Sequence, residues 1–241
     1  MTKIYEANHH VCIHTGYADP IEHCHTAAHI IISLYGMMNV KCDGEPFLCH
    51  GVVIPAKTPH QIDTYDKDVL VFLYAPTADV TRQIKNICCI SEESCGRVVQ
   101  RYSDFEHGAI SYSAFEETLL EELGFTAKGT CMTDERVLSA IKYIHSSLSN
   151  RISCKEVADA VCLSQGRFSH LFRKQMGMTF AAYLIYQRLL YVYAAIIQGK
   201  SITEAALDAG FSSSSHFADV NRRVFGISAS SITKDVTFTK V

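Results

Sequence analysis

One short pattern occurs twice in the C-terminal part of this 241-residue chain, and it restricts the possible folds more than any other feature. Each copy begins with Ser and has Glu three residues later: Ser153 with Glu156, and Ser201 with Glu204. This spacing is typical of a capping box, in which the Ser and Glu side chains bond the first free backbone N–H groups of a helix. Each copy is therefore predicted to open a helix.

The two copies correspond beyond the capping box, with one extra residue in the second turn. The matched positions are Glu156-Val157-Ala158 with Glu204-Ala205-Ala206, Ser164 with Ser212, Phe168 with Phe217, Arg173-Lys174 with Arg222-Arg223, and Gly177 with Gly226. Each copy is a short helix, a tight turn and a longer helix, which is helix-turn-helix architecture. Between them, a long helix is predicted from Phe180 to Gln198, capped by Thr179 and ended by Gly199.

The second helix of such a unit lies in the major groove of DNA, with its N-terminal residues facing the base edges. Gln can pair with adenine and Arg with guanine, while flanking basic side chains hold phosphates. A helical hairpin in an unrelated bundle is the alternative, but it explains a capped pair of units poorly. The predicted DNA-binding residues are Ser164, Gln165, Arg167, His170, Arg173 and Lys174 in the first unit, and Ser213, Ser214, His216, Arg222 and Arg223 in the second.

Charge is distributed unevenly along the chain. Residues 151–241 hold 11 Lys and Arg against 6 Asp and Glu, a net charge of +5, whereas residues 1–150 carry −8. This division suits a sensor joined to a nucleic-acid binder. No apolar run approaches the ~18–20 residues that span a bilayer. The polar start has no secretion signal, so a cytoplasmic protein without membrane contact is expected.

Residues 1–78 have the pattern of a β-rich domain. Short apolar segments such as Ile30–Leu34, Val52–Ile54 and Val69–Tyr74 alternate with turn signals, which favours a barrel or double-sheet jelly roll. Apolar residues then recur at helical spacing at Val80, Ile84 and Ile87. The predicted fold is α+β: a sensor domain at 1–78, a helical connector at 79–131 that carries dimer contacts, and a DNA-binding domain at 132–241.

Over residues 133–232 the chain closely resembles the AraC/XylS (arabinose-regulator) family of transcription factors. The resemblance implies two helix-turn-helix subdomains on successive major-groove faces, sequence-specific binding to double-stranded promoter DNA, a homodimer and no enzymatic activity. The residues that carry it are Ser164, Phe168, Phe172, Arg173-Lys174, Gly177, Arg188, Glu204, Ala206, Gly210-Phe211, Ser215, Phe217, Arg222-Arg223 and Gly226.

The departures from the family pattern fall in or after the second unit. Asp219 stands where the family has Arg, Asn221 stands where it has a core Phe, and its closing Pro-x-x-Tyr-Arg is replaced by the sequence from Ala229 to Thr233. An acidic residue weakens phosphate contact, and a buried Asn without a partner costs about 1–3 kcal/mol. The second unit is therefore expected to bind DNA weakly or to serve mainly for positioning.

Histidines concentrate in the N-terminal part. His23, His25 and His29 have the same parity, so on one strand they would share a face, and His60 follows a turn at Pro59 that could bring it back. We expect His9, His10 and His14 at the surface or in a disordered segment. This part also resembles the cupin family through Gly16, His23-Cys24-His25, His29 and Gly36, and then Gly51, Pro55, His60 and Thr64.

The cupin resemblance implies that the metal ligands are His23, His25, His29 and His60, with His29 in place of the usual Glu. Imidazoles of this kind suit zinc, nickel, iron or copper. The alternative is a pocket for an organic effector that uses these histidines without metal. The leading hypothesis is thus a transcription regulator that senses a metal ion or small molecule.

Two other functions stay open. The first is a metal-dependent cupin enzyme with an attached DNA module, although no general base is visible. The second is an interaction protein whose second unit has lost DNA binding. The ten cysteines include no CxxC pair. Cys88, Cys89 and Cys95 are interpreted either as small apolar filler or as a thiol or soft-metal sensor.

Overall fold

The computed structural model describes residues 2–7, 10–16, 21–24, 27–65, 67–75, 78–126, 134–148, 152–225 and 236–241. Its backbone contacts divide the chain into two compact units. Unit 1 comprises Met1–Thr130, Phe225–Ile227 and Lys234–Val241, and unit 2 comprises Cys131–Val224 and Ser228–Thr233.

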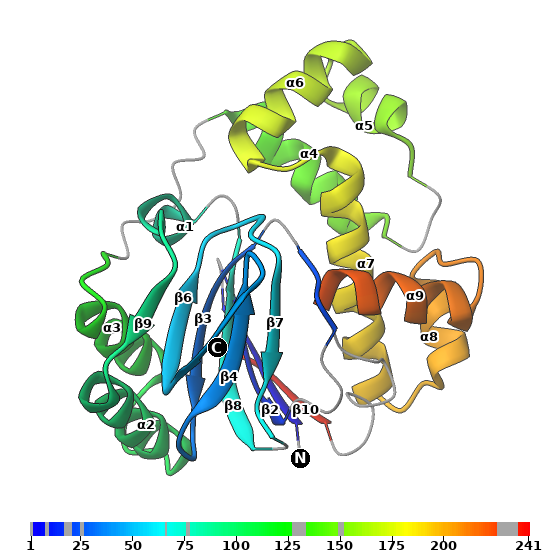
Figure 1. Ribbon diagram of the computed structural model, residues 1–241. Coiled ribbons are helices and arrows are strands. Elements are labelled where there is room, and N and C mark those ends of the chain that lie inside the picture. The colour runs from blue at the N-terminus through cyan, green and yellow to red at the C-terminus, as the bar shows by residue number, and fades with distance from the viewer. Residues whose placement is uncertain are drawn as a thin grey trace. The chain divides into compact units, whose positions relative to one another are not determined.

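Unit 1 is built on two β-sheets, one of which lies across the other (Figure 1). The larger sheet is antiparallel except at its β1–β10 edge. The predicted strands are confirmed as β3, β6 and β8, and the β-rich unit and helical unit confirm the α+β class. The larger sheet has the order β10 (Val236–Lys240), β1 (Thr2–Glu6), β2 (His10–Gly16), β8 (Asp68–Tyr74), β3 (Ala28–Ser33), β6 (Gly51–Ile54), β9 (Cys88–Ile90), and the smaller has β5 (Glu45–Cys49), β4 (Met38–Cys42), β7 (His60–Asp63).

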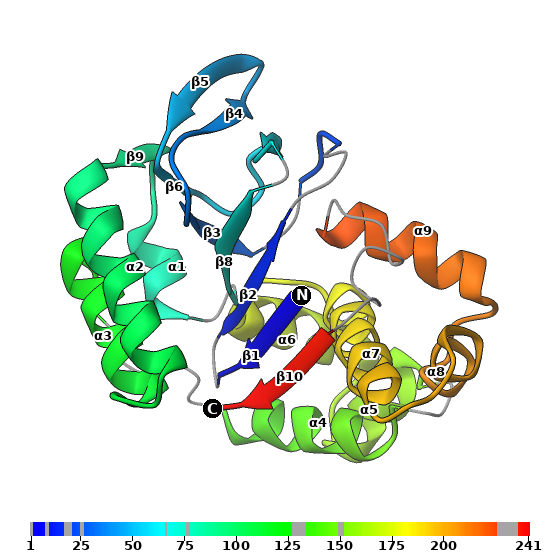
Figure 2. The same cartoon turned by 90° about the horizontal axis from the view of Figure 1, so that it is seen from below.

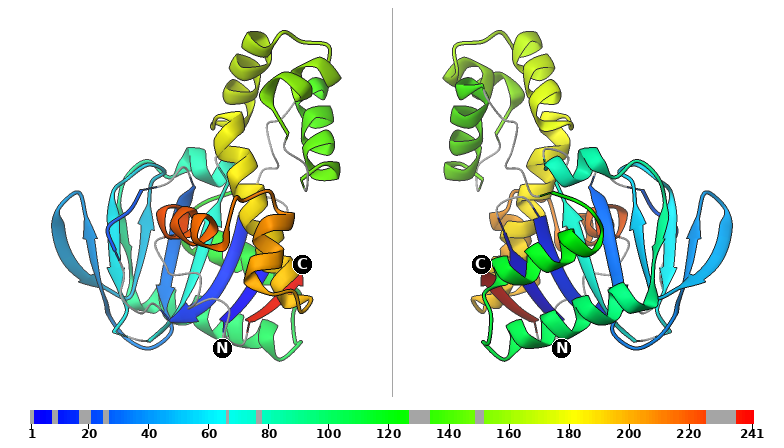
Figure 3. Two further views of the ribbon diagram at one scale, coloured as in Figure 1. Left: turned by 90° about the vertical axis from the view of Figure 1, so that its right-hand side faces the viewer. Right: turned by 90° about the vertical axis from the view of Figure 1, so that its left-hand side faces the viewer.

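Three helices complete unit 1: α1 (Asp79–Gln83), α2 (Glu92–Glu106) and α3 (Tyr112–Glu122). Helices α2 and α3 cover the face of the larger sheet that points away from the smaller one (Figure 3). Alternate residues of the strands, including Ile30 and Phe72, pack there against Phe115 and Leu119. The other set of alternate residues faces the smaller sheet, because successive strand side chains point to opposite faces.

The helical pattern predicted after residue 78 is only partly correct. Helix α1 ends at Gln83, Ile84 has extended backbone angles, and Ile87 precedes strand β9. Pairing of β9 with β6 outweighs the local helical spacing here. The next stretch, which the sequence pattern left irregular, contains the 15-residue helix α2, capped by the Ser91 side chain.

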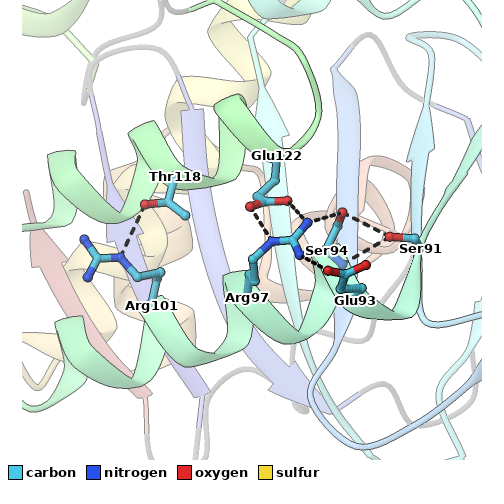
Figure 4. A network of polar contacts seen from close by, with 7 residues as sticks. All are labelled: Ser91, Glu93, Ser94, Arg97, Arg101, Thr118 and Glu122. Carbon is cyan, nitrogen blue, oxygen red and sulfur yellow. Dashed lines mark hydrogen bonds and ion pairs between the residues drawn. The ribbon is translucent and has the colours of Figure 1, made fainter.

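A polar network joins α2 to α3 on the surface (Figure 4). Arg97 donates to both carboxylate oxygens of Glu122 at 2.6 Å and to Glu93 at 2.7 Å. The Glu122 contact holds the pKa of that carboxyl below its usual range. One guanidinium therefore ties the two covering helices to each other.

His10 and His14 are not at the surface, contrary to expectation. His10 is only 3% exposed, and its ring nitrogens lie 2.6 Å from the Tyr112 hydroxyl and 3.2 Å from the Glu116 carboxylate. His14 bonds the Tyr102 hydroxyl at 2.9 Å. Both residues have their side chains on the face of β2 that packs against α2 and α3. There the rings contact polar side chains of these helices, namely Tyr102, Tyr112 and Glu116. His9 lies outside the described residues.

Unit 2 is helical, as predicted. Both capping boxes are confirmed, at Ser153 with Glu156 and at Ser201 with Glu204. In α4 the buried stripe is Val137, Ala140 and Ile144, whereas Leu138 is 39% exposed. The helices are α4 (Glu135–Ser146), α5 (Cys154–Ala160), α6 (Gln165–Met176), α7 (Phe180–Ile197), α8 (Ile202–Asp208) and α9 (Ser214–Phe225).

The two helix-turn-helix units align slightly differently from the predicted match. The Ser164 hydroxyl accepts the Arg167 N–H, and the equivalent cap in the second unit is Ser213, which accepts the His216 N–H. Matching Ser164 to Ser212 was therefore wrong by one residue. Cys162 and Gly210 both have left-handed backbone angles at the same point of the turn, so the two units match up to Leu163 and Phe211. The extra residue of the second unit therefore lies between Phe211 and its cap, Ser213.

The last described segment leaves unit 2 and returns to unit 1. Strand β10 pairs in parallel with β1 over five residues, from Thr2 with Val236 to Glu6 with Lys240 (Figure 2). The sequence analysis had assigned these residues to the DNA-binding domain. An edge strand whose partner stands at the far end of the sequence leaves no local pattern by which to predict it.

By length and composition, helix α7 is a candidate membrane span. This differs from the expectation that no apolar run approaches that length. The helix carries Gln187 and Arg188 mid-helix. Several of its side chains are buried within unit 2, among them Leu184, Leu189 and Val192. The helix joins the two helix-turn-helix units, and its apolar character is that of a core helix.

Candidate DNA interface and histidine cluster

Helix α6 presents the predicted recognition residues of the first unit on its exposed side. Phe168, Phe172 and Met176 turn inward, which leaves the polar positions outside. Arg167, His170 and Lys174 recur at spacings of three and four, so they share one face of the helix. Exposed positions are Ser164, Gln165, Arg167, His170, Arg173 and Lys174.

Two serines at or near this face also have local structural tasks. The Ser164 hydroxyl is the N-cap of α6 and accepts the Arg167 N–H at 3.4 Å. Ser169, which we did not single out, contacts the Cys154 thiol at 3.4 Å and so links α6 to α5. The side chains of Gln165, Arg167 and His170 thus remain the best candidates for reading bases.

In the second unit, more of the polar groups at the start of α9 form hydrogen bonds with one another than at the start of α6. The Ser213 hydroxyl caps the helix at 3.0 Å from the His216 N–H. The Nδ1 atom of His216 accepts from the Ser212 hydroxyl at 3.0 Å and lies 3.4 Å from the Ser212 N–H. An accepting Nδ1 places the ring proton on Nε2, which suits donation to a phosphate or a base acceptor. Arg222 and Arg223 are exposed in the last turn, and Ser214 is partly buried.

The departures in the second unit have different consequences. Asp219 is exposed, as an acidic residue on the helix surface should be. Asn221 is fully buried, and it accepts a short hydrogen bond from the Tyr193 hydroxyl of α7. The energetic cost expected of a buried Asn without a partner therefore does not arise. Two other features lie outside the described residues: Gly226, and the closing segment from Ala229 to Thr233.

Three of the four predicted metal ligands meet between the two sheets of unit 1. His29 is on β3 of the larger sheet, and His60 begins β7 of the smaller one. The ring centroids of His29 and His60 are 4.7 Å apart, and those of His23 and His60 are 4.4 Å apart. His25 lies outside the described residues.

His23 reaches the cluster by a route that we did not predict. It does not continue the strand of His29, because β3 begins only at Ala28. Instead His23 forms an isolated antiparallel bridge with His60, with two backbone hydrogen bonds of 2.9 Å. The turn after Pro59 does bring His60 back, as the sequence suggested.

Backbone carbonyls orient two of these rings. The His23 Nδ1 atom is 3.0 Å from the Ile21 carbonyl, and the His60 Nδ1 atom is 2.8 Å from the Thr58 carbonyl. Each Nδ1 therefore carries a proton, and each Nε2, which is buried, presents a lone pair. Burial, followed by the nearby His23, lowers the pKa of His60 to about 4. Burial also lowers the pKa of His23, so both rings are neutral at pH 7.

Within the described residues, no group of three or more His, Cys, Asp or Glu side chains is already arranged to hold a metal ion. The cluster that is described thus consists of two adjoining ring pairs that share His60. These neutral imidazole rings lie in the interior of unit 1, where most buried side chains are apolar. Ile31, Val52 and Ile62 are examples.

Comparison with known proteins identifies the helical unit. Residues 157–235 match a family model described as "Helix-turn-helix domain". The chain is 32% identical to the regulatory protein PocR of Salmonella typhimurium over 107 residues, covering 44% of this chain and 35% of PocR. It is 28% identical to the arabinose operon regulatory protein of the same species over 140 residues, covering 57% and 48%. The C-terminal unit is therefore similar to regulators of the AraC/XylS family.

The predicted AraC/XylS resemblance is thereby confirmed. A longer match, 28% identity over 177 residues, joins the chain to the thermoregulatory protein LcrF of Yersinia pestis and covers 68% of this chain and 59% of LcrF. The chain spans less than two thirds of the length of these relatives. All three are named as regulators and none as an enzyme.

Solved structures show a likeness in fold over most of the chain. Apo ToxT from Vibrio cholerae has a TM-score of 0.57 at 11% identity, covering 94% of this chain and 97% of ToxT. ToxT with an unsaturated fatty acid bound has the same TM-score and covers 92% and 94%. At this identity the likeness concerns the fold alone.

Proposed function

We propose that this AraC/XylS protein is a transcription regulator that binds promoter DNA through unit 2 and a signal through unit 1. The observation that carries the proposal is the exposed face of α6, where Gln165, Arg167 and His170 stand at the start of a capped helix. These side chains match the donor and acceptor patterns of base edges in the major groove.

Unit 2 is suited to DNA in both of its halves. Arg173 and Lys174 in α6 and Arg222 and Arg223 in α9 occupy the last turns, where positive charge favours phosphate contact. We assign base reading to α6. For α9 we propose phosphate contact and positioning, because Ser212, Ser213 and His216 bond one another locally.

For unit 1 we propose a cupin-like barrel whose histidine cluster binds a divalent transition metal such as zinc, nickel, iron or copper. The fit rests on the tautomers: a metal-bound His typically donates its other ring N–H to a carbonyl, as His23 and His60 do here. His23, His29 and His60 would hold the ion, with His25 as the predicted fourth ligand. When bound, the metal would link the two sheets through neutral imidazoles.

An organic effector in the same space is the second candidate. It is favoured by the apolar residues around the cluster and by the fatty acid bound in ToxT, a protein of the same fold. We also propose a homodimer in the bacterial cytoplasm, because the AraC/XylS resemblance implies one. A cupin enzyme with a DNA module is the weakest candidate, because no general base or substrate-orienting residue is proposed beyond the histidines themselves.

The DNA proposal is tested by selecting binding sequences from a random duplex library with the full chain and then measuring affinity. Arg167→Ala should lower the affinity for the selected sequence about 10- to 100-fold and relax the preference at one base pair. Arg82→Ala, which removes an equal charge from α1, is the matched control and should change neither. Equal binding of selected and random DNA by the wild-type protein would refute sequence-specific recognition.

The metal proposal is tested by elemental analysis of the purified protein, followed by zinc and nickel titrations against a chelating dye. His29→Ala and His60→Ala should lose binding, whereas His107→Ala, at the exposed C-cap of α2, should retain it. A protein that binds no metal in either assay refutes the metal version. A change in thermal stability on adding long-chain carboxylic acids would then support the organic effector.

A further inference from the structure

A group of cysteines outside the histidine cluster lies where the open edges of the two sheets meet. Strand β5 is an edge of the smaller sheet, and β9 is an edge of the larger one. Cys49 is the last residue of β5, and Cys89 is the middle residue of β9. All the described cysteines are free thiols.

The strand register brings these two thiols together. Only His50 separates Cys49 from β6, and β6 pairs with β9 so that Gly51 opposes Ile90 and Val52 opposes Cys89. Ile90 and Val53 belong to the core beneath α2, so Cys89 points to the opposite face, toward the smaller sheet. The Cys89 thiol therefore lies on the side of β9 that faces the strand ending at Cys49, close enough to influence the pKa of the Cys49 thiol.

The two thiols differ in their surroundings. Cys89 is exposed, whereas Cys49 is only 5% exposed. Burial, and next the proximity of Cys89, raises the pKa of the Cys49 thiol to about 12. Cys49 is therefore a poor first nucleophile, and Cys89 is the thiol that a solvent-borne oxidant meets first.

We propose that Cys49 and Cys89 form an oxidisable dithiol that a peroxide converts into a disulfide between β5 and β9. The Cys89 sulfur displaces an alcohol or water from the peroxide and becomes a sulfenic acid. The Cys49 thiol then attacks that sulfur, an S–S bond forms and water leaves, so two electrons pass from the thiols to the peroxide. The bridge covalently joins the edge strands of the two sheets beside the start of α2.

The test uses the full chain, fully reduced, treated with hydrogen peroxide, alkylated and digested with trypsin without reductant. Peptides 42–57 and 86–97 should be joined, and fragmentation should place the bond at Cys49 and Cys89. Because these peptides also contain other cysteines, the triple variant with Cys42→Ser, Cys88→Ser and Cys95→Ser should still form the cross-link. Dithiothreitol should reverse it in both proteins.

Single variants separate the two steps. Cys89→Ser should abolish the bridge, and Cys49→Ser should leave a Cys89 sulfenic acid that dimedone labels. Cys88→Ser is the matched control, because Cys88 is the residue next to Cys89 in β9. This variant should still form the Cys49–Cys89 bridge. A wild-type protein that accumulates labelled Cys89 without a bridge, or that bridges through Cys88 or only between molecules, would overturn the proposal. The wild-type fragmentation is decisive even if a variant fails to fold.

Discussion

The Tyr193 hydroxyl donates a hydrogen bond to the side-chain oxygen of Asn221 inside the second helix-turn-helix unit. Both residues are buried, Tyr193 on α7 and Asn221 on α9. A position that the AraC/XylS pattern fills with an aromatic side chain is thus filled by a polar pair. The second unit has kept a satisfied core and has changed mainly its surface, at Asp219.

Removing one partner of this pair should be costly. Tyr193→Phe leaves the Asn221 oxygen without this donor and should lower the free energy of unfolding by about 1–3 kcal/mol. Asn221→Ala should also destabilise the unit. The double variant should cost less than the sum of the two, and urea denaturation of all four proteins measures this coupling. Additive effects would show that the hydrogen bond contributes nothing.

Substitutions at the matched left-handed position should have different effects in the two turns of unit 2. Gly210 has φ +83°, and a Cβ there would lie 3.0 Å from the Arg188 guanidinium. Gly210→Ala should therefore destabilise the protein by roughly 1–2 kcal/mol. Cys162 already holds the equivalent conformation at φ +56°, so Cys162→Gly should stay within about 1 kcal/mol of the wild type. Thermal unfolding compares them, and a harmless Gly210→Ala would contradict the assigned strain.

Phosphate contact by the end of α6 should be visible in the salt dependence of DNA binding. Each phosphate neutralised contributes about 0.9 to the slope of log affinity against log salt concentration. Lys174→Ala should lower the slope by about 1 for selected and random DNA alike. Arg167→Ala should change the ratio between those two DNAs instead. Titrations at several salt concentrations check this, and an unchanged Lys174→Ala slope would exclude a phosphate contact.

The Arg97–Glu122 pair predicts a pH dependence of unit 1. Because Arg97 lowers the pKa of the Glu122 carboxyl in the folded state, the pair stabilises the fold at pH values above about 4.3, the unfolded pKa. That contribution is lost as the pH falls through the lower folded pKa. Arg97→Gln should therefore be slightly destabilising at pH 7 and indistinguishable from the wild type near pH 3.

Urea unfolding at both pH values measures the difference, which is small because solvent surrounds the pair. Glu122→Gln serves as the second variant and should show the same loss of effect in acid. A destabilisation by Arg97→Gln that persists at pH 3 would show that the side chain acts by packing rather than by charge.

The sequence was most informative where the determinants are local. Capping boxes at Ser153 and Ser201 and the turn glycine Gly177 predicted the helices of unit 2 almost residue by residue. Helix α2 was missed because its buried stripe is Cys95, Val98 and Tyr102. These residues recur at helical spacing, but Cys and Tyr are not strongly apolar, so the pattern was not recognised. Counting Cys95 and Tyr102 as core residues would have revealed the helix.

The histidine cluster was predicted as a set but not as a geometry. Parity suggested one strand for His23 and His29, whereas the bridge of His23 with His60 is a pairing between distant segments. The contact of Cys49 with Cys89 likewise depends on how β6 pairs with β9. Such pairings are decided by tertiary structure, and no local pattern encodes them.

The parallel pairing of β10 with β1 has a consequence for how the protein is made. On the ribosome β1 emerges before β10, and unit 2 is synthesised between the two strands that form this sheet edge. Until β10 has emerged, the outer side of β1 exposes unpaired backbone groups to other nascent chains. The newborn protein is therefore expected to depend on chaperones during translation more than a chain in which unit 1 is complete before unit 2 begins.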